Sequence, residues 1–248
     1  MKIAILSDIH SNLEAMIACC RRARSVGVKR YVCLGDMVGY GADPVPVLDL
    51  VINLPGLIAV RGNHDEAVLT GEYHNVNPAV QLVFAWTRGK LLDRHRQFLQ
   101  ELPYVQNAYG AVFAHASVHN PQSWPYLLDM VSVRNCMLAA PRPVVFTGHT
   151  HLPALFHETA AGGIKQQLVR EDSVIPVYQG KRYFVNVGSV GQPRDGSSTS
   201  SFVVYDTVQR ELTFHRVAYD YTQTAKKILE AGFPPQFAER LAGRKQGP

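Results

Sequence analysis

The feature that most constrains this chain is a set of short apolar segments that each end in polar residues. Segments such as KIAILS, YVCL, LIAV, AVFA and VVFT have the length and composition of buried strands. In α/β sheets, ligands bind beyond the carboxyl ends of the strands, so we expect the polar residues to lie together. They are Asp8-Ile9-His10, Gly35-Asp36, Arg61-Gly62-Asn63-His64-Asp65, His115 and Gly148-His149-Thr150-His151.

The order of elements predicts an α/β fold. The first half, residues 1–152, alternates strand-like and helix-like segments, and its first helix is expected to start at a capping box, Ser11 to Glu14. Residues 153–220 have a strand-like pattern interrupted by turns, and we expect this half to form a second sheet packed on the first. Residues 221–248 are expected to be short helices. With no long linker or repeat, we expect a single domain over residues 1–248.

Composition narrows the classes of protein. The chain has 248 residues, of which 46% are hydrophobic, enough for a large buried core. No apolar run is long enough to span a membrane, and the N-terminus has no signal-peptide pattern, so we expect a cytoplasmic protein without a membrane partner. The four cysteines form no CxxC pair and are expected to stay reduced. The formal net charge of +5 favours an anionic partner, but no basic cluster indicates nucleic acid.

The strand-end residues have the chemistry of metal ligands. Asp8 and His10 are two positions apart, as are His149 and His151. Alternate residues of an extended chain point to the same side, so each pair is expected to reach one centre. Carboxylate, imidazole and amide oxygen suit a divalent metal of the manganese, iron or zinc type.

The number of ligands favours two ions. Seven candidates are too many for one ion and about right for two ions roughly 3.5–4 Å apart. Two such ions generate hydroxide and stabilise in-line displacement at phosphorus. Asp36 stands alone between paired clusters, and we expect it to bridge the ions. The candidates are Asp8, His10, Asp36, Asn63, His115, His149 and His151.

These motifs carry a resemblance to a known family. DxH, GD, GNHD, a later His and GHTH, in this order, resemble the calcineurin-like metallophosphoesterase family. SDIHSNLEA, LGDMVGYGADP, RGNHDEAV and NVGSVGQPRDG are similar to its small bacterial and archaeal phosphodiesterase-like branch, which includes diadenosine tetraphosphatase-like proteins. The resemblance implies a four-layer α/β/β/α sandwich of two packed mixed sheets flanked by helices.

The resemblance also implies a role for each residue. It assigns His64 to the substrate phosphate, as a transition-state stabiliser or general acid, and Asp65 to orienting His64. The metal assignment is Asp8, His10 and His151 on one ion, Asn63, His115 and His149 on the other, and Asp36 shared. Manganese or iron is the preferred metal, with zinc as the alternative.

Three residues that follow the last predicted ligand in the sequence are further candidates for the site. In the segment Asn186 to Gly196, family likeness implies that Asn186 and Ser189 support the metal ligands. Arg194 is expected to meet a phosphate, as is Arg61 beside the GNHD motif. The remaining histidines are expected to be ordinary core or surface residues: His74, His95, His119, His157 and His215.

The resulting hypothesis is a dinuclear metal-dependent phosphoesterase. A metal-bridging hydroxide would attack a phosphodiester or nucleotide-type bond of a small substrate directly, without a covalent intermediate. One alternative is a phosphomonoesterase or protein phosphatase that uses the same site. Another is a catalytically silent scaffold of the same fold, which the intact set of ligands and His64 disfavours.

Overall fold

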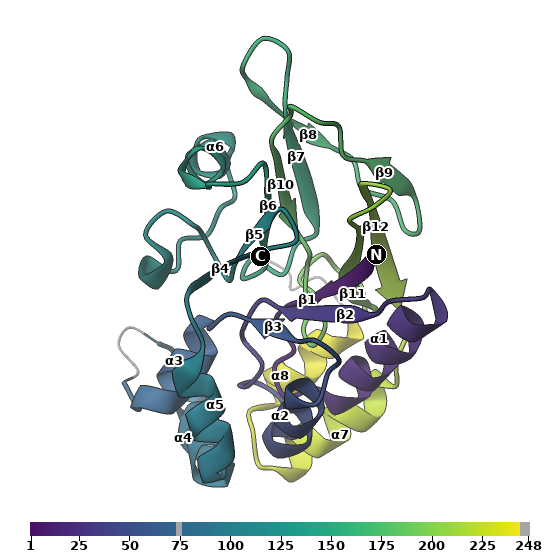
Figure 1. Cartoon of the computed structure of the whole chain (residues 1–248). Coiled ribbons are helices and arrows are strands. Elements are labelled where there is room, and N and C mark those ends of the chain that lie inside the picture. Colours follow the sequence, from purple (N-terminus) through teal and green to yellow (C-terminus); the bar gives the residue numbers. More distant parts are fainter. Residues whose placement is uncertain (73–75, 244–248) are drawn as a thin grey trace.

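Two six-stranded sheets pack face to face between layers of helices in the computed structural model (Figure 1), which describes residues 1–72 and 76–243. His74 and residues 244–248 of the predicted C-terminal helical segment lie outside the described residues. Within the described part, none of the helices is long and apolar enough to cross a membrane.

The strands are mostly short, and the helices that flank them are longer. The strands are β1 (Lys2–Leu6), β2 (Arg30–Cys33), β3 (Ile58–Ala59), β4 (Val105–Ala108), β5 (Ala111–Ala114), β6 (Val144–Thr147), β7 (Ala154–Glu158), β8 (Ile164–Gln167), β9 (Val174–Pro176), β10 (Tyr183–Asn186), β11 (Ser200–Asp206) and β12 (Glu211–Val217). The α-helices are α1 (Leu13–Ser25), α2 (Pro44–Ile52), α3 (Asn63–Thr70), α4 (Pro78–Lys90), α5 (Asp93–Glu101), α6 (Met130–Ala139), α7 (Tyr221–Glu230) and α8 (Pro235–Glu239). Two 3₁₀ turns, η1 (Pro121–Ser123) and η2 (Arg240–Ala242), complete the described elements.

Both sheets are mixed, and both halves of the chain contribute to each. The first sheet has the order β3-β2-β1-β11-β12-β9, and the second has the order β4-β5-β6-β10-β7-β8. Strands β1, β2 and β3 run parallel, as do β5, β6 and β10. The expectation that the second half forms its own sheet is therefore wrong. Strands β7, β8 and β10 extend the second sheet, whereas β9, β11 and β12 extend the first.

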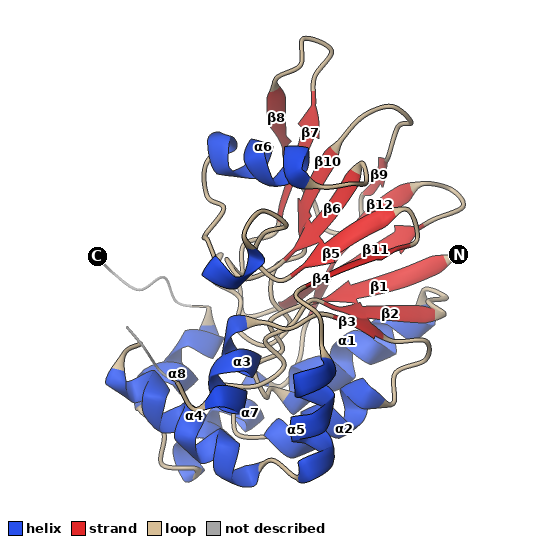
Figure 2. Cartoon of the chain, turned by 60° about the vertical axis from the view of Figure 1, so that its left-hand side comes forward, coloured by secondary structure: helices blue, strands red, loops and turns tan. Residues whose placement is uncertain are grey.

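Alternation along the strands separates the apolar layers. In β1, Ile3 and Ile5 pack between the two sheets, whereas Ala4 and Leu6 face the helices. Helix α6 covers the other face of the second sheet through residues such as Val133. Figure 2 shows α6 apart from the other helices, which gather on the opposite side of the strands. The four layers of the predicted sandwich follow from these contacts.

The first helix begins one residue later than the capping box predicts. Asn12, not Ser11, is the N-cap, and its side chain accepts a hydrogen bond from the amide of Ala15 at 3.1 Å. Ser11 instead has a left-handed backbone with φ of 52°. All four cysteines are buried and unpaired, as expected for reduced thiols: Cys19, Cys20, Cys33 and Cys136.

Candidate metal centre and adjoining cavity

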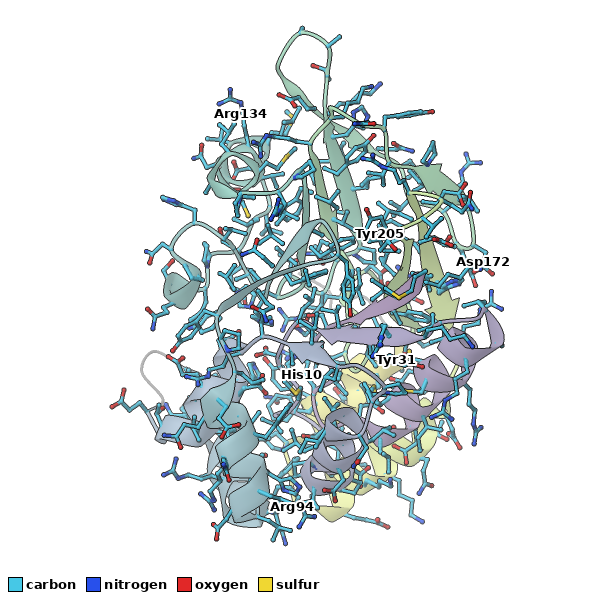
Figure 3. The ribbon with its side chains drawn as sticks, viewed as in Figure 1. His10, Tyr31, Arg94, Arg134, Asp172 and Tyr205 are labelled. Atoms are coloured by element: carbon cyan, nitrogen blue, oxygen red, sulfur yellow. The ribbon has the colours of Figure 1, made fainter. Side chains whose placement is uncertain are left out.

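The seven predicted metal ligands converge where strands of both sheets end. They occupy the loops after β1, β2, β5 and β6 and the first residue of α3, which follows β3. Figure 3 shows His10 near the middle of the molecule, between the strands and the helices. Six of the seven are buried, and Asn63 is partly exposed. We call these residues the ligand cluster: Asp8, His10, Asp36, Asn63, His115, His149 and His151.

Each histidine of the ligand cluster is anchored through one ring nitrogen. That nitrogen contacts a backbone carbonyl, and because a carbonyl can only accept, this nitrogen must carry the proton. The opposite nitrogen of each neutral ring is then a bare lone pair, the form that binds metal. The contacts are His10 Nδ1 to Val38 O at 3.2 Å, His115 Nδ1 to Leu34 O at 2.8 Å, His149 Nε2 to Trp124 O at 3.0 Å and His151 Nδ1 to Gln192 O at 2.5 Å.

The four free nitrogens face one another in two pairs. His10 Nε2 lies 3.1 Å from His151 Nε2, and His115 Nε2 lies 3.1 Å from His149 Nδ1. Two lone pairs at this distance repel each other unless a cation or a proton lies between them. The arrangement therefore fits a positively charged group at each pair.

Two carboxylates complete these pairs. Asp8 Oδ1 is buried without a hydrogen-bond partner and lies 3.1 Å from His151 Nε2. Asp36 Oδ2 lies 3.4 Å from His115 Nε2 and 3.9 Å from His10 Nε2, so it stands between the two pairs. A buried, unpartnered carboxylate oxygen is costly unless a cation balances it. The donor set of each pair, imidazole with carboxylate, suits a divalent transition metal.

The pKa values of His149 and His10 agree with neutral rings, and that of His115 indicates a bound proton. Burial lowers the pKa of His149 to about 3 and that of His10 well below its usual value, which keeps both rings neutral. Burial also opposes protonation of His115, but the charge and hydrogen bond of Asp36 outweigh it and raise the pKa of His115 to about 9. A proton on His115 is therefore the metal-free substitute for a cation, and metal binding has to displace it.

A left-handed backbone, not an extended one, directs many of these side chains. Asp8 and His10 have φ of 53° and 49°, and His149 and His151 have φ of 65° and 61°. The expectation that alternate residues of extended chain reach one centre is therefore wrong in its reason. Asp8 and His10 do meet, with Oδ1 and Nε2 3.7 Å apart, but His149 and His151 join different facing pairs. Non-glycine residues with positive φ are uncommon and concentrate at functional sites, where the surrounding structure compensates the strain.

Glycines allow the loops to approach this closely. A Cβ atom on Gly62 would lie 2.1 Å from Asp36 Oδ1, and one on Gly148 would lie 2.4 Å from Asp8 Oδ2. Both carboxylates therefore rest directly against a neighbouring backbone. The glycines in the GNHD and GHTH motifs serve packing of the ligands rather than chain flexibility.

His64 lies beside the ligand cluster without joining either facing pair. Its Nε2 is 3.8 Å from Asp36 Oδ2, and its Nδ1 is buried without a hydrogen-bond partner. The rings of His10, Tyr40 and Phe84 surround it, with centroids 4.6–4.8 Å away. Burial lowers the pKa of His64 to about 4, so the ring is neutral at pH 7.

Asp65 does not orient His64 as predicted. Its Oδ1 accepts hydrogen bonds from the amides of Met37 and Val38 at 2.9 and 3.3 Å, and its Oδ2 accepts one from Gly62 at 3.1 Å. Among the described residues these amides are its hydrogen-bond partners, because a carboxylate near a helix N-terminus satisfies free backbone donors. Asp65 therefore ties the start of α3 to the loop that carries Asp36.

Asn186 and Ser189 contact the loops that carry the ligands. Asn186 Nδ2 donates to the carbonyl of Gly148 at 2.7 Å and to Thr150 Oγ1 at 3.0 Å. Ser189 Oγ donates to the carbonyl of Asp8 at 2.8 Å. Each hydrogen bond fixes backbone next to a ligand, which is the supporting position that family likeness implied.

The two arginines that are predicted to contact phosphate, Arg61 and Arg194, differ in the contacts of their side chains. The three guanidinium nitrogens of Arg61 donate to the carbonyls of Leu99 and Gln100 and to the hydroxyl of Tyr104, at 2.7–3.2 Å. The prediction that Arg61 contacts phosphate is therefore wrong. Arg61 instead ties the segment before α3 to the end of α5. Arg194 is exposed, has no ion pair within the described chain, and its positive charge contributes to lowering the pKa of His64. It stays a candidate for anion contact.

A cavity of about 530 Å³ opens beside the ligand cluster. Asn63 and His64 form its inner end. The charged residues of the remainder are one cation, Arg240, and two carboxylates, Glu66 and Glu72. Aromatic side chains line much of the rest, and we call this space the ring cavity after them: Tyr40, Phe84, Trp124, Tyr126 and Phe237, with Arg240. Sequence reasoning missed these residues. Only Tyr40 carried a signal, since it lies in the block LGDMVGYGADP that follows β2.

Comparison with known proteins identifies the family. The sequence matches the family model of the calcineurin-like phosphoesterase superfamily domain over residues 1–210. A protein of Methanocaldococcus jannaschii is 36% identical over 248 residues, covering 96% of both chains. A metallophosphoesterase from Sphaerobacter thermophilus has a similar crystal structure, with a TM-score of 0.87, 34% identity, and coverage of 98% of this chain and 100% of that one.

A second crystal structure supports the fold alone. It is a protein from Pyrococcus horikoshii OT3 with a TM-score of 0.80 at 18% identity, covering 100% of this chain and 99% of that one. The two mixed sheets and flanking helices therefore recur in distant relatives. On the match over residues 1–210, this chain belongs to the calcineurin-like phosphoesterase superfamily.

Proposed function

We propose that this protein is a phosphodiesterase that depends on two divalent metal ions held by the ligand cluster. The observation that carries the proposal is the two pairs of facing histidine nitrogens, 3.1 Å apart in each case, on either side of Asp36. When bound there, two ions supply a water-derived nucleophile and offset the charge of the phosphate oxygens. The superfamily of phosphoesterases provides the reaction class.

The ligands divide between the ions along the facing pairs. Three residues would hold each ion, and Asp36 would be shared, because its Oδ2 lies within 4 Å of a histidine from each pair. Manganese or iron is our preference, and zinc is the alternative, since availability and geometry decide among such metals. The first set is Asp8, His10 and His151, and the second is Asn63, His115 and His149.

His64 would act on the substrate. It is neutral at pH 7, lies beside Asp36, and forms the inner end of the ring cavity. A neutral imidazole in this position can donate its N–H to a phosphate oxygen and stabilise the negative charge that develops there. Arg194 is exposed and close enough to His64 to lower its pKa, so it would add a positive charge for the substrate phosphate.

A small phosphodiester, nucleotide-like in our proposal, fits better than a monoester. A diester carries two organic groups, and the ring cavity gives room for one of them beside the ligand cluster. A phosphomonoesterase would use the same ligands, so it remains the competing activity. We also infer that the chain works as one domain, because each sheet takes strands from both halves of the chain.

The test compares one metal-loaded preparation on two substrates. With Mn²⁺, kcat/KM for bis(p-nitrophenyl) phosphate is expected to exceed that for p-nitrophenyl phosphate, and chelator is expected to abolish both activities. A clear preference for the monoester would replace the diesterase proposal with the phosphatase alternative. Full activity in chelator, with no transition metal found by elemental analysis, would sink the metal mechanism.

A further inference from the structure

The ring cavity has the size of a ligand site. Its volume, about 530 Å³, lies within the roughly 300–1,000 Å³ of small-molecule sites in proteins. It reaches from the partly exposed Asn63 and the ring of His64 toward loops and helices on both sides. A ligand in this cavity would therefore begin at the ligand cluster and extend away from it.

One wall of the cavity is an aromatic platform next to the ligand cluster. The ring of Tyr126 stacks on His149 with centroids 4.2 Å apart and planes at 28°, yet 54% of Tyr126 is exposed. Trp124 lies edge-on to His115 at 5.8 Å, and its backbone has a φ of 49°. A bulky residue in this left-handed conformation is rare, and here it coincides with the carbonyl contact to His149. Ordinary core packing does not leave a stacked tyrosine half exposed.

The C-terminal segment around α8 forms another wall of the cavity. Phe237 of α8 lines the cavity, and the guanidinium of Arg240 lies over its ring at 5.8 Å. Within the described chain, Arg240 has no ion pair, so its planar cation is available to a ligand. Both residues lie beyond residues 1–210, the part that matches the superfamily domain. This wall therefore lies outside the residues matched by the superfamily model, but within the length shared with the Sphaerobacter thermophilus structure, which covers 98% of this chain.

Polar contacts fix that wall to the loops of the ligand cluster. Lys227 of α7 donates to Glu14 of α1 and to Asp43 before α2. Thr224 of α7 donates to Asn12 Oδ1 at 3.0 Å, two residues after the ligand His10. These contacts fix α7, and α8 packs with α7 and Tyr40 in one apolar cluster, so α8 is held relative to the ligand cluster, as a recognition surface requires.

We propose that the ring cavity binds the nucleobase of a nucleotide ester whose phosphate lies at the ligand cluster. The base would stack on Tyr126 and Trp124, and the guanidinium of Arg240 would face it from the C-terminal wall. Aromatic and guanidinium planes are the surfaces on which bases stack in single-stranded nucleic-acid sites. This inference rests on the proposed phosphodiesterase function and names its substrate class.

Binding of products tests the inference without any need for turnover. The probes are AMP, ribose 5-phosphate and phenyl phosphate, titrated by calorimetry into Mn²⁺-loaded full-length protein. AMP is expected to bind more tightly than ribose 5-phosphate, because the base adds stacking. Tyr126→Ala and Trp124→Leu are each expected to reduce this preference by roughly 5- to 100-fold, the range for loss of one base–aromatic stack. Arg240→Ala is expected to reduce it less.

Matched variants on exposed surface serve as controls. Tyr178 is as exposed as Tyr126, at 58%, and Tyr178→Ala is expected to leave the preference unchanged. Arg134 on α6 lies far from His10 in Figure 3, so Arg134→Ala is the control for Arg240→Ala. An equal affinity for AMP and ribose 5-phosphate, or a preference that survives Tyr126→Ala and Trp124→Leu, would overturn the inference.

The remaining outcomes separate this inference from the proposed function. Phenyl phosphate places a ring directly on the phosphate, and tighter binding of it than of AMP would replace the nucleobase with an aryl group. The wild-type protein could prefer AMP, lose that preference in Tyr126→Ala, and yet hydrolyse no diester. That result would support the nucleobase site in the ring cavity and refute the proposed phosphodiesterase activity. Diester hydrolysis without any base preference would do the reverse.

Discussion

The ligand cluster and the ring cavity adjoin each other but are built in opposite ways. All four histidines of the ligand cluster are buried and fixed by backbone carbonyls, and glycines press the backbone against both carboxylates. The ring cavity is lined by side chains from loops and C-terminal helices, and Tyr126 is half exposed. The cluster leaves little freedom to its ligands, whereas the half-exposed ring of Tyr126 is held on one face, by His149.

This difference assigns separate tasks to the two regions. Rigid, desolvated ligands hold charge at fixed positions, which is what electrostatic catalysis needs. In our proposal the half-exposed ring of Tyr126 contributes to the choice of substrate, together with Phe237 and Arg240, which lie outside the residues matched to the superfamily. Changes in the ligand cluster should therefore alter the rate for every substrate, and changes in the ring cavity should alter the ratio between substrates.

The largest effect is expected from Asp36→Asn. The substitution removes the charge shared by both facing pairs, so metal content should fall and kcat should drop by roughly 10³-fold or more for diesters and monoesters alike. Elemental analysis and steady-state kinetics measure the two effects. Asp49→Asn is the control, since Asp49 is partly exposed and pairs with Arg94 at 3.0 Å and with His95 at 2.9 Å, outside the ligand cluster. A variant that keeps two metals and its turnover would break the assignment of Asp36.

His64→Ala is expected to separate metal binding from chemistry. His64 joins neither facing pair, so both metals should be retained, while kcat should fall by roughly 10²–10⁴-fold if the neutral His64 stabilises the transition state by donating its N–H. The preference for AMP over ribose 5-phosphate should persist, because Tyr126, Trp124 and Arg240 are unchanged. The role is refuted if the variant loses metal and regains full activity once metal is restored.

The two regions also differ in how far the sequence predicted them. The seven candidate ligands lie in short motifs at strand ends, so parallel strands bring them together whatever the rest of the chain does. The pairing of strands was mispredicted, because β10 and β11 are close in sequence but join different sheets. Partners across a sheet are non-local, and the pattern of a single strand does not encode them.

Side-chain partners were harder still to predict. Arg61 and Asp65 stand in a catalytic motif, yet both bind the protein's own backbone, at Gln100 and Met37 among others. Their chemistry suits a ligand and a backbone group equally, so only the fold decides between the two. Tyr126 and Arg240 are more than 100 residues apart in the sequence and have no motif, and they line one cavity only because the C-terminal segment that carries Arg240 folds back beside the ligand cluster.

Lys227→Met should affect the ring cavity and spare the ligand cluster. Lys227 is partly buried between Glu14 and Asp43, so its loss leaves two acidic groups unpaired and should cost roughly 1–3 kcal/mol of unfolding free energy. Metal content should stay unchanged, and the AMP preference should fall by a few-fold as the C-terminal wall loosens. Urea denaturation and calorimetry measure these effects.

The neighbouring lysine provides the matched control. Lys226 pairs with Glu230 at 3.7 Å, and both side chains are mostly exposed. Exposed pairs of this kind add little to stability, so Lys226→Met should change neither quantity. An equal effect of the two substitutions would show that α7 does not hold the cavity wall through Lys227.

The smallest effect concerns His215, a buried histidine that belongs to neither region. Its Nδ1 contacts Asp172 Oδ1 at 2.5 Å, where the cluster histidines contact carbonyls. Burial lowers the pKa of His215 although Asp172 raises it, so below about pH 6.5 the unfolded chain binds the proton more readily than the folded one. The stability that His215 contributes is present above that pH and lost as the pH falls below it.

His215→Gln should therefore flatten the pH dependence of stability. Between pH 7.5 and 5.5, the unfolding free energy of metal-free wild type should fall more than that of the variant, by at most about 1.4 kcal/mol per pH unit for one proton. Burial raises the pKa of Asp172, but Arg22 and His215 outweigh it, so this pKa is lowered. Asp172 therefore takes up a proton only near and below pH 4, outside the range from pH 7.5 to 5.5. Because the comparison is between two metal-free proteins, protons taken up by the ligand cluster cancel. A steeper pH dependence in the variant would mean that Asp172 outweighs burial at His215, and that a carboxylate partner in this fold raises a histidine's pKa as it does at His115.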